Sequence, residues 1–162
     1  MMRRVLIFVV AMLAASACGG SGDGGVDRRP DVLAELGGPD AFVITVDEVD
    51  DSVVRLETWR YYEAATQLEF VDGELLWSVE IESLPDGSLY PLWYDPAEFT
   101  MLASMGETLS VLDDVTLTEI DPGDEAMPDT VLLAGDQLLL AFTHDKLIYV
   151  ETFPLSPEEV GP

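Results

Sequence analysis

Cysteine, histidine and basic residues are scarce in this chain of 162 residues, which contains one cysteine and one histidine. A single cysteine excludes an internal disulfide, and together with a single histidine it leaves a structural zinc site short of ligands. His144 stands beside Asp145, and no Gly-x-Ser-x-Gly pattern marks a nucleophile. We therefore predict that the protein is not an enzyme and has no catalytic residue, metal ligand or cofactor.

Basic residues number 7 against 32 acidic ones, which makes the formal net charge −25. Nucleic acid is excluded as a partner because binding phosphates requires clustered lysine and arginine. An anionic membrane surface would repel the chain as well. A simpler explanation of the charge is solubility in a salty medium. Residues 47–51 and 121–125 are acidic loops, but neither has the ligand spacing of an EF-hand, which favours solvated turns over a calcium site.

The longest apolar run, residues 5–15, is shorter than the roughly 20 residues that a membrane-spanning helix needs. It follows Arg3 and Arg4 and precedes small residues, which is typical of a secretory signal peptide. We predict that residues 1–17 are this signal peptide. Residues 18–29 are rich in glycine and predict a flexible tether.

Residues 15–18, Ala-Ser-Ala-Cys, resemble the lipobox of bacterial lipoproteins, with Ala15 where leucine is usual. The resemblance implies cleavage before Cys18 and acylation of that residue, with palmitate among the expected acyl chains. The expected location is then the extracytoplasmic face of the cell membrane, and the expected partner is the membrane itself through the lipid anchor. The alternative is an ordinary signal peptide beside an incidental Cys18.

Residues 30–153 are expected to form one α+β domain in which short helices pack on antiparallel sheet, followed by a flexible tail at 154–162. The helices are expected at residues 30–36 and 95–106, from their capping and proline signals. Alternating apolar residues predict the strands. These are expected at residues 41–46, 54–62, 67–71, 75–82, 109–112, 115–120, 130–134, 138–143 and 147–153.

Asp72-Gly73 separates two alternating runs and predicts a β-hairpin, because both residues of a type I′ turn need positive φ. The alternation places Trp77 on the inward face of the second hairpin strand, together with Leu75, Val79 and Ile81. At an offset of 72 residues this hairpin matches a second one, with Phe70 opposite Phe142. Residues 30–84 and 92–153 are therefore candidates for two degenerate repeats, although any two hairpins share such alternation.

Four aromatic residues are candidates for an exposed interaction surface: Trp59, Tyr61, Trp93 and Tyr94. Strand periodicity favours the alternative that most of the aromatic residues pack in the core or on the sheet.

Three short motifs resemble the SmpA/OmlA family of small lipoproteins. They are Leu-Ala-Glu-Leu-Gly-Gly-Pro-Asp at 33–40, Trp-Arg-Tyr at 59–61 and Leu-Glu-Phe-Val-Asp-Gly-Glu-Leu at 68–75. The resemblance implies helices on an antiparallel sheet, related in shape to the repeats of β-lactamase inhibitory protein. It also implies a non-catalytic role in the cell envelope, which in the best-known member is support of outer-membrane barrel assembly. We thus expect a structural or protein-interaction module with an envelope protein as partner, or alternatively a small-ligand-binding or inhibitor-like domain that uses exposed aromatic residues.

Overall fold

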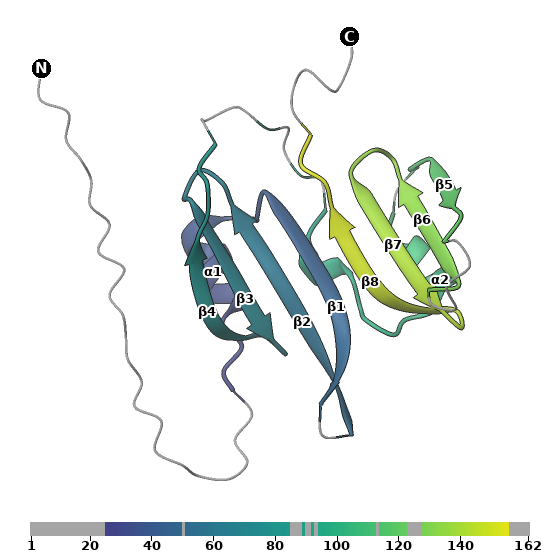
Figure 1. Cartoon of the computed structure of the whole chain (residues 1–162), viewed down its shortest axis with the longest axis horizontal. Coiled ribbons are helices and arrows are strands. Elements are labelled where there is room, and N and C mark those ends of the chain that lie inside the picture. Colours follow the sequence, from purple (N-terminus) through teal and green to yellow (C-terminus); the bar gives the residue numbers. More distant parts are fainter. Residues whose placement is uncertain are drawn as a thin grey trace, which may run out of the picture.

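A single antiparallel sheet dominates the computed structural model, which describes residues 25–49, 51–84, 89, 92, 94–112, 114–122 and 128–155. The sheet has eight strands in the order β4-β3-β2-β1-β8-β7-β6-β5. In Figure 1 the short helices lie behind it. The strands are β1 (Ala41–Val49), β2 (Ser52–Tyr61), β3 (Thr66–Val71), β4 (Glu74–Glu80), β5 (Leu117–Ile120), β6 (Thr130–Ala134), β7 (Leu138–Thr143) and β8 (Lys146–Thr152).

The predicted α+β class is wrong, because little of the sheet is covered by helix. The first helix, α1 (Arg29–Leu36), forms where we expected it but contains no buried residue. Much of the covering layer consists instead of the irregular segment that follows β4, whose Phe99 is fully buried and whose Tyr94 and Met101 pack against the core. The fold is therefore a large antiparallel sheet with short helical turns on one face.

The second predicted helix, residues 95–106, is also wrong, and it is replaced by two separate turns. The 3-10 helix η1 (Pro96–Glu98) begins at Asp95, whose side chain accepts a hydrogen bond from the Ala97 N–H. Phe99 then takes an extended conformation, with φ −94° and ψ 109°. Burying this phenyl ring, which a continuous exposed helix would leave partly in water, outweighs the helical signals of the sequence.

A short helix, α2 (Met105–Leu109), follows, and it begins with a capping box between Ser104 and Glu107. The sequence contained this Ser-x-x-Glu signal, but we had ended the previous helix there. Because α2 extends to Leu109 and is followed by turns, the strand expected at 109–112 is wrong as well.

The two halves of the sheet join through β1 and β8, which pair antiparallel at Ile44 and Val150. A buried threonine strengthens this joint: the Phe42 N–H donates to the Thr152 hydroxyl oxygen at 2.7 Å, and that hydroxyl donates to the Phe42 carbonyl at 3.2 Å. The core then runs through both halves on one face of the sheet. Its fully buried large side chains include Phe42, Trp59, Phe70, Phe99, Phe142, Ile44, Leu138, Leu140, Leu147 and Val150.

The predicted Asp72-Gly73 turn is confirmed, since both residues have positive φ, 47° and 87°. A side chain at Gly73 would also meet the Asp27 carboxylate, 2.6 Å from the added Cβ. We therefore expect Gly73→Val to lower the free energy of unfolding by about 1–3 kcal/mol in a urea melt. Gly38→Ala is the matched control, because nothing lies within 4 Å of its Cβ. Equal effects of the two substitutions would contradict the strained-turn explanation.

A β-bulge in β4 reverses the predicted orientation of Trp77. Phe70 pairs with Leu75 but Glu69 pairs with Trp77, so Leu76 is an extra residue without a partner. One extra residue turns every following side chain to the other face of the sheet. Trp77 therefore lies on the face turned away from the core and is 56% exposed, and its predicted inward orientation is wrong.

The same bulge occurs in the second half of the chain. Phe142 pairs with Leu147 while Ala141 pairs with Tyr149, which leaves Ile148 as the extra residue. Ile148 is 72 residues after Leu76, the offset at which the two hairpins matched in sequence. The turn before β8, His144-Asp145, also has positive φ at both residues, 50° and 64°. The proposed duplication remains a prediction, but its alignment now matches turn to turn and bulge to bulge.

Candidate functional site

A cavity of about 510 Å³ lies on the core side of the sheet, between α1, the η1 segment, and strands β1 and β2. Its wall combines apolar side chains with five charged ones. The charged residues are Asp27, Arg29, Arg55, Glu57 and Asp72, and the apolar ones include Leu33, Val46, Val53, Trp59, Phe99, Met101 and Leu102.

Three of these residues come from β2 with a spacing of two. Arg55, Glu57 and Trp59 share one face of the strand because side chains alternate along it. Glu57 is the central residue and is only 2% exposed. Its carboxylate accepts hydrogen bonds from Arg55 Nε at 2.8 Å and from Trp59 Nε1 at 3.0 Å.

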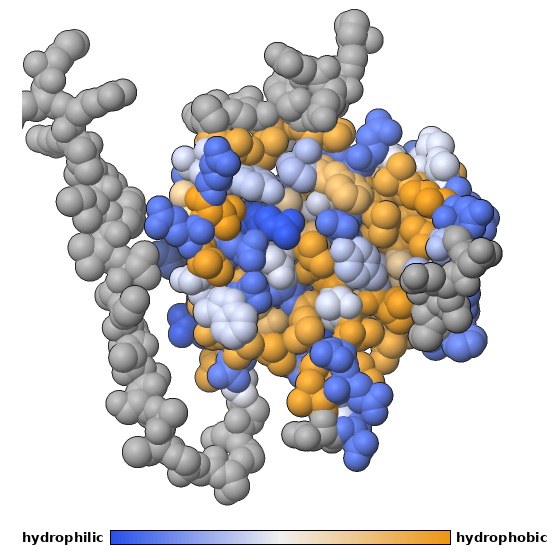
Figure 2. Space-filling model, in the orientation of Figure 1, coloured by the Kyte–Doolittle hydropathy of each residue, from blue (hydrophilic) through white to orange (hydrophobic). Residues whose placement is uncertain are grey.

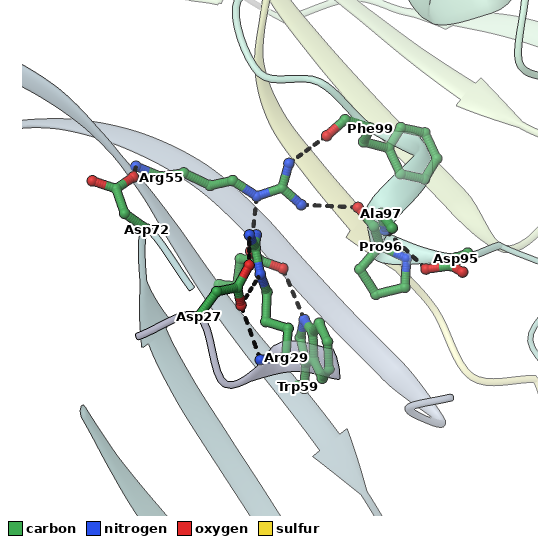
Figure 3. Close-up of polar contacts among 10 residues, drawn as sticks. Asp27, Arg29, Arg55, Trp59, Asp72, Asp95, Pro96, Ala97 and Phe99 are labelled. Atoms are coloured by element: carbon green, nitrogen blue, oxygen red, sulfur yellow. Dashed lines mark hydrogen bonds and ion pairs between the residues drawn. The ribbon is translucent and has the colours of Figure 1, made fainter. Parts of the chain in front are cut away.

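Two arginines connect this carboxylate to the elements that cover the sheet. Arg29 of α1 reaches Glu57 at 2.5 Å and Asp27 at 2.6 Å. Arg55 donates to the carbonyl of Pro96 at 2.8 Å and to the carbonyl of Phe99. Figure 3 shows these side chains converging from the helix and the strand. The network therefore fastens α1 and the η1 segment to β2.

Electrostatics favours the ionised form of this cluster. The side-chain hydrogen bond from Arg29 holds the pKa of Asp27 below its ordinary value of 3.8. The same bond raises the pKa of Arg29. A lowered carboxyl pKa stabilises the fold above the pKa of the unfolded chain, and this contribution is lost as pH falls through the folded value. The Glu57 carboxylate already accepts three hydrogen bonds from charged or indole donors, which suits an anchor better than a proton-transfer group.

The residues predicted as an interaction surface do not come together on the outside. Trp59 and Tyr61 are core residues, and the Tyr61 hydroxyl donates to the Gly37 carbonyl at 3.1 Å. Tyr94 is half-buried and packs near Phe99, with ring centroids 6.5 Å apart. Trp93, like the predicted lipidation residue Cys18, lies outside the described residues. The exposed aromatic platform thus does not include Trp59 or Tyr61.

The exposed apolar residues lie instead on β4, at one end of the sheet. Leu76, Trp77 and Val79 are 48%, 56% and 45% exposed, and together we call them the β4 edge. β4 pairs with β3 on one side and with no strand of the described chain on the other. Figure 2 shows the face turned away from the helices, where hydrophobic and hydrophilic residues mix on the β4 side.

Sequence reasoning missed the β4 edge because alternation alone placed Trp77 and Val79 in the core. The signal that could have revealed it is the continuous Leu75-Leu76-Trp77 run, which breaks the alternation at the bulge. The opposite end of the sheet, β5, also carries exposed apolar residues, Leu117 and Ile120.

In the part of the chain that the structure describes, no three acidic, histidine or cysteine side chains gather where they could hold a metal ion. No helix among the described residues is long and apolar enough to cross a membrane. Comparison with protein-family models, curated proteins and solved structures finds no match for this chain.

Proposed function

We propose that this protein is a membrane-anchored, extracytoplasmic module that binds another protein of the cell envelope through the β4 edge and carries out no catalysis. The observation that carries the proposal is the exposure of Trp77 between two other exposed apolar residues on an unpaired strand. Tryptophan is the residue type most enriched among those that dominate binding energy at interfaces. Covering these side chains would remove apolar surface from water, which favours association.

The path of the chain supports a partner close to the membrane. The predicted tether ends where the described domain begins, and there the Arg28 N–H donates to the Gly73 carbonyl at 2.9 Å. Gly73 belongs to the turn that leads into β4. The chain therefore enters the domain beside the β4 edge, which favours partners held at the same membrane.

The anchor itself has a direct test. We expect Cys18→Ala to abolish incorporation of a fatty-acid analogue and to release the protein from the membrane, because acylation at this residue is the proposed attachment. The melting temperature of the purified domain should not change, since Cys18 lies outside the described residues. Labelling that persists in the Cys18→Ala variant would contradict the lipoprotein assignment.

The interaction surface is tested by photocrosslinking in the producing cells. A benzoylphenylalanine at position 77 should form a discrete crosslinked product with another protein. The matched control is the same group at position 117, which is also exposed and on an edge strand but at the other end of the sheet. No product from position 77, or identical products from both positions, would contradict a binding surface at β4.

The cavity favours a second candidate function, the binding of a small ligand. Its volume of about 510 Å³ falls in the range of ligand pockets, and both apolar and charged side chains line it. Val46→Phe would fill part of this space. Loss of a bound small molecule in that variant, with the position-77 crosslink unchanged or absent, would favour ligand binding over the protein-interaction function.

A further inference from the structure

We propose that the β4 edge binds its partner by strand addition, taking up an extended, basic segment as an antiparallel ninth strand. This inference rests on the proposed function and specifies the mode of binding and the chemistry of the partner. It starts from the equivalence of β4 and β8 in the two halves of the chain.

The two strands agree in their bulges, in their preceding turns, and in a hydrogen bond at their ends. The Ile81 N–H donates to the Ala65 carbonyl at 3.0 Å, and 72 residues later the Phe153 N–H donates to the Gln137 carbonyl at 2.8 Å. The outer side of β8 is occupied, because β1 pairs with it antiparallel at Val150. The equivalent side of β4 has no strand in the described chain.

The backbone of β4 is arranged to accept such a strand. Hydrogen-bonded and non-hydrogen-bonded pairs alternate along an antiparallel ladder. Because Ile81 bonds to β3, the same phase places the backbone groups of Val79 and Trp77 toward β3. The N–H and C=O groups of Ser78 and Glu80 then point away from the sheet. Ser78 is the equivalent of Val150, the residue of β8 that pairs with β1.

Charge selects the partner. β4 carries Glu74 and Glu80 at its two ends, Glu69 lies beside Trp77 on the same face, and the chain has a formal net charge of −25. A second copy pairing two-fold around Trp77 would place Glu74 opposite Glu80, and like charges directly opposite are destabilising. Lysine or arginine at those positions of a partner strand would instead be complementary. Apolar residues of the added strand would cover Trp77 and Val79.

The test uses a peptide of about nine residues, enough to span β4, with alternating lysine and valine, and a matched peptide with glutamate in place of lysine. We expect only the lysine peptide to bind the purified domain and to slow hydrogen exchange at the Ser78 and Glu80 amides. Ser78→Pro should weaken binding by at least about tenfold, because the ring removes the outward N–H while proline is tolerated on an edge strand. Circular dichroism verifies that this variant is folded.

Charge reversal provides a variant that does not depend on the backbone. Glu74→Lys with Glu80→Lys should reverse the preference between the two peptides, whereas Glu119→Lys on β5 should leave it unchanged. Equal binding of both peptides would overturn the basic-partner chemistry. A concentration-dependent dimer that Ser78→Pro abolishes would show a second copy as the occupant and overturn the proposal. Peptide binding without protection of Ser78 and Glu80 would overturn strand addition, while the crosslink at position 77 separately decides the proposed function.

Discussion

Trp59→Ala should destabilise the domain by about 3–5 kcal/mol, because it removes a large side chain from a closely packed site. Trp59 is 1% exposed, and its ring lies 4.8 Å from that of Phe70, centroid to centroid. The substitution also removes the indole N–H that donates to Glu57 at 3.0 Å. Urea denaturation of the purified domain without its signal peptide and tether would measure the loss.

The matched control is Trp77→Ala, which makes the same chemical change on β4. Because Trp77 is 56% exposed, we expect a loss of less than about 1 kcal/mol. The pair also tests the bulge, since an unbroken alternation would turn Trp77 into the core. Similar large losses from both variants would contradict the register described for β3 and β4.

Glu57→Ala should also cost about 3–5 kcal/mol, because removing one member of a buried ion pair leaves its partners uncompensated. The partners are Arg29 and Arg55, whose side chains are 27% and 18% exposed. Losing the carboxylate would also release the guanidinium groups that connect α1 and the η1 segment to β2. We therefore expect faster hydrogen exchange in residues 96–102 than in β7, in addition to the lower stability.

Glu48→Ala, an exposed glutamate on the neighbouring strand β1, is the control for Glu57. It should change stability by less than about 0.5 kcal/mol, as is usual for surface substitutions. A loss for Glu57→Ala no larger than that of this control would mean that the charged network does not hold the covering segment. Uniform exchange across the domain would contradict its local role.

Local signals predicted most of the strands and one of the helices. Asp72-Gly73 specified its turn because few residue pairs tolerate positive φ at both positions. Alternation located strands such as β6 and β7, whose inward residues are strongly apolar. The same alternation failed in β4, because a bulge depends on how two strands pair and not on the composition of either one.

The site was less predictable than the fold. Arg55, Glu57 and Trp59 stand at a spacing of two on a predicted strand, so their shared face could have been inferred from the sequence. Their convergence with Arg29 could not, because that contact joins residues 28 positions apart through the docking of α1. The β4 edge required both the strand order and the bulge, and neither is a local property of the chain.

The sequence by itself determined the turns, most of the strands, the acidic surface and the features that predict export and lipidation, because each depends on neighbouring residues or on composition. Tertiary structure decided which face each strand buries, and it ended the predicted second helix at Phe99, where burial of the ring outweighed helix capping. It also joined β1 to β8, which lie about a hundred residues apart and meet only when both half-sheets have formed. Pairing over that distance lowers the free energy through contacts that no short stretch of sequence contains.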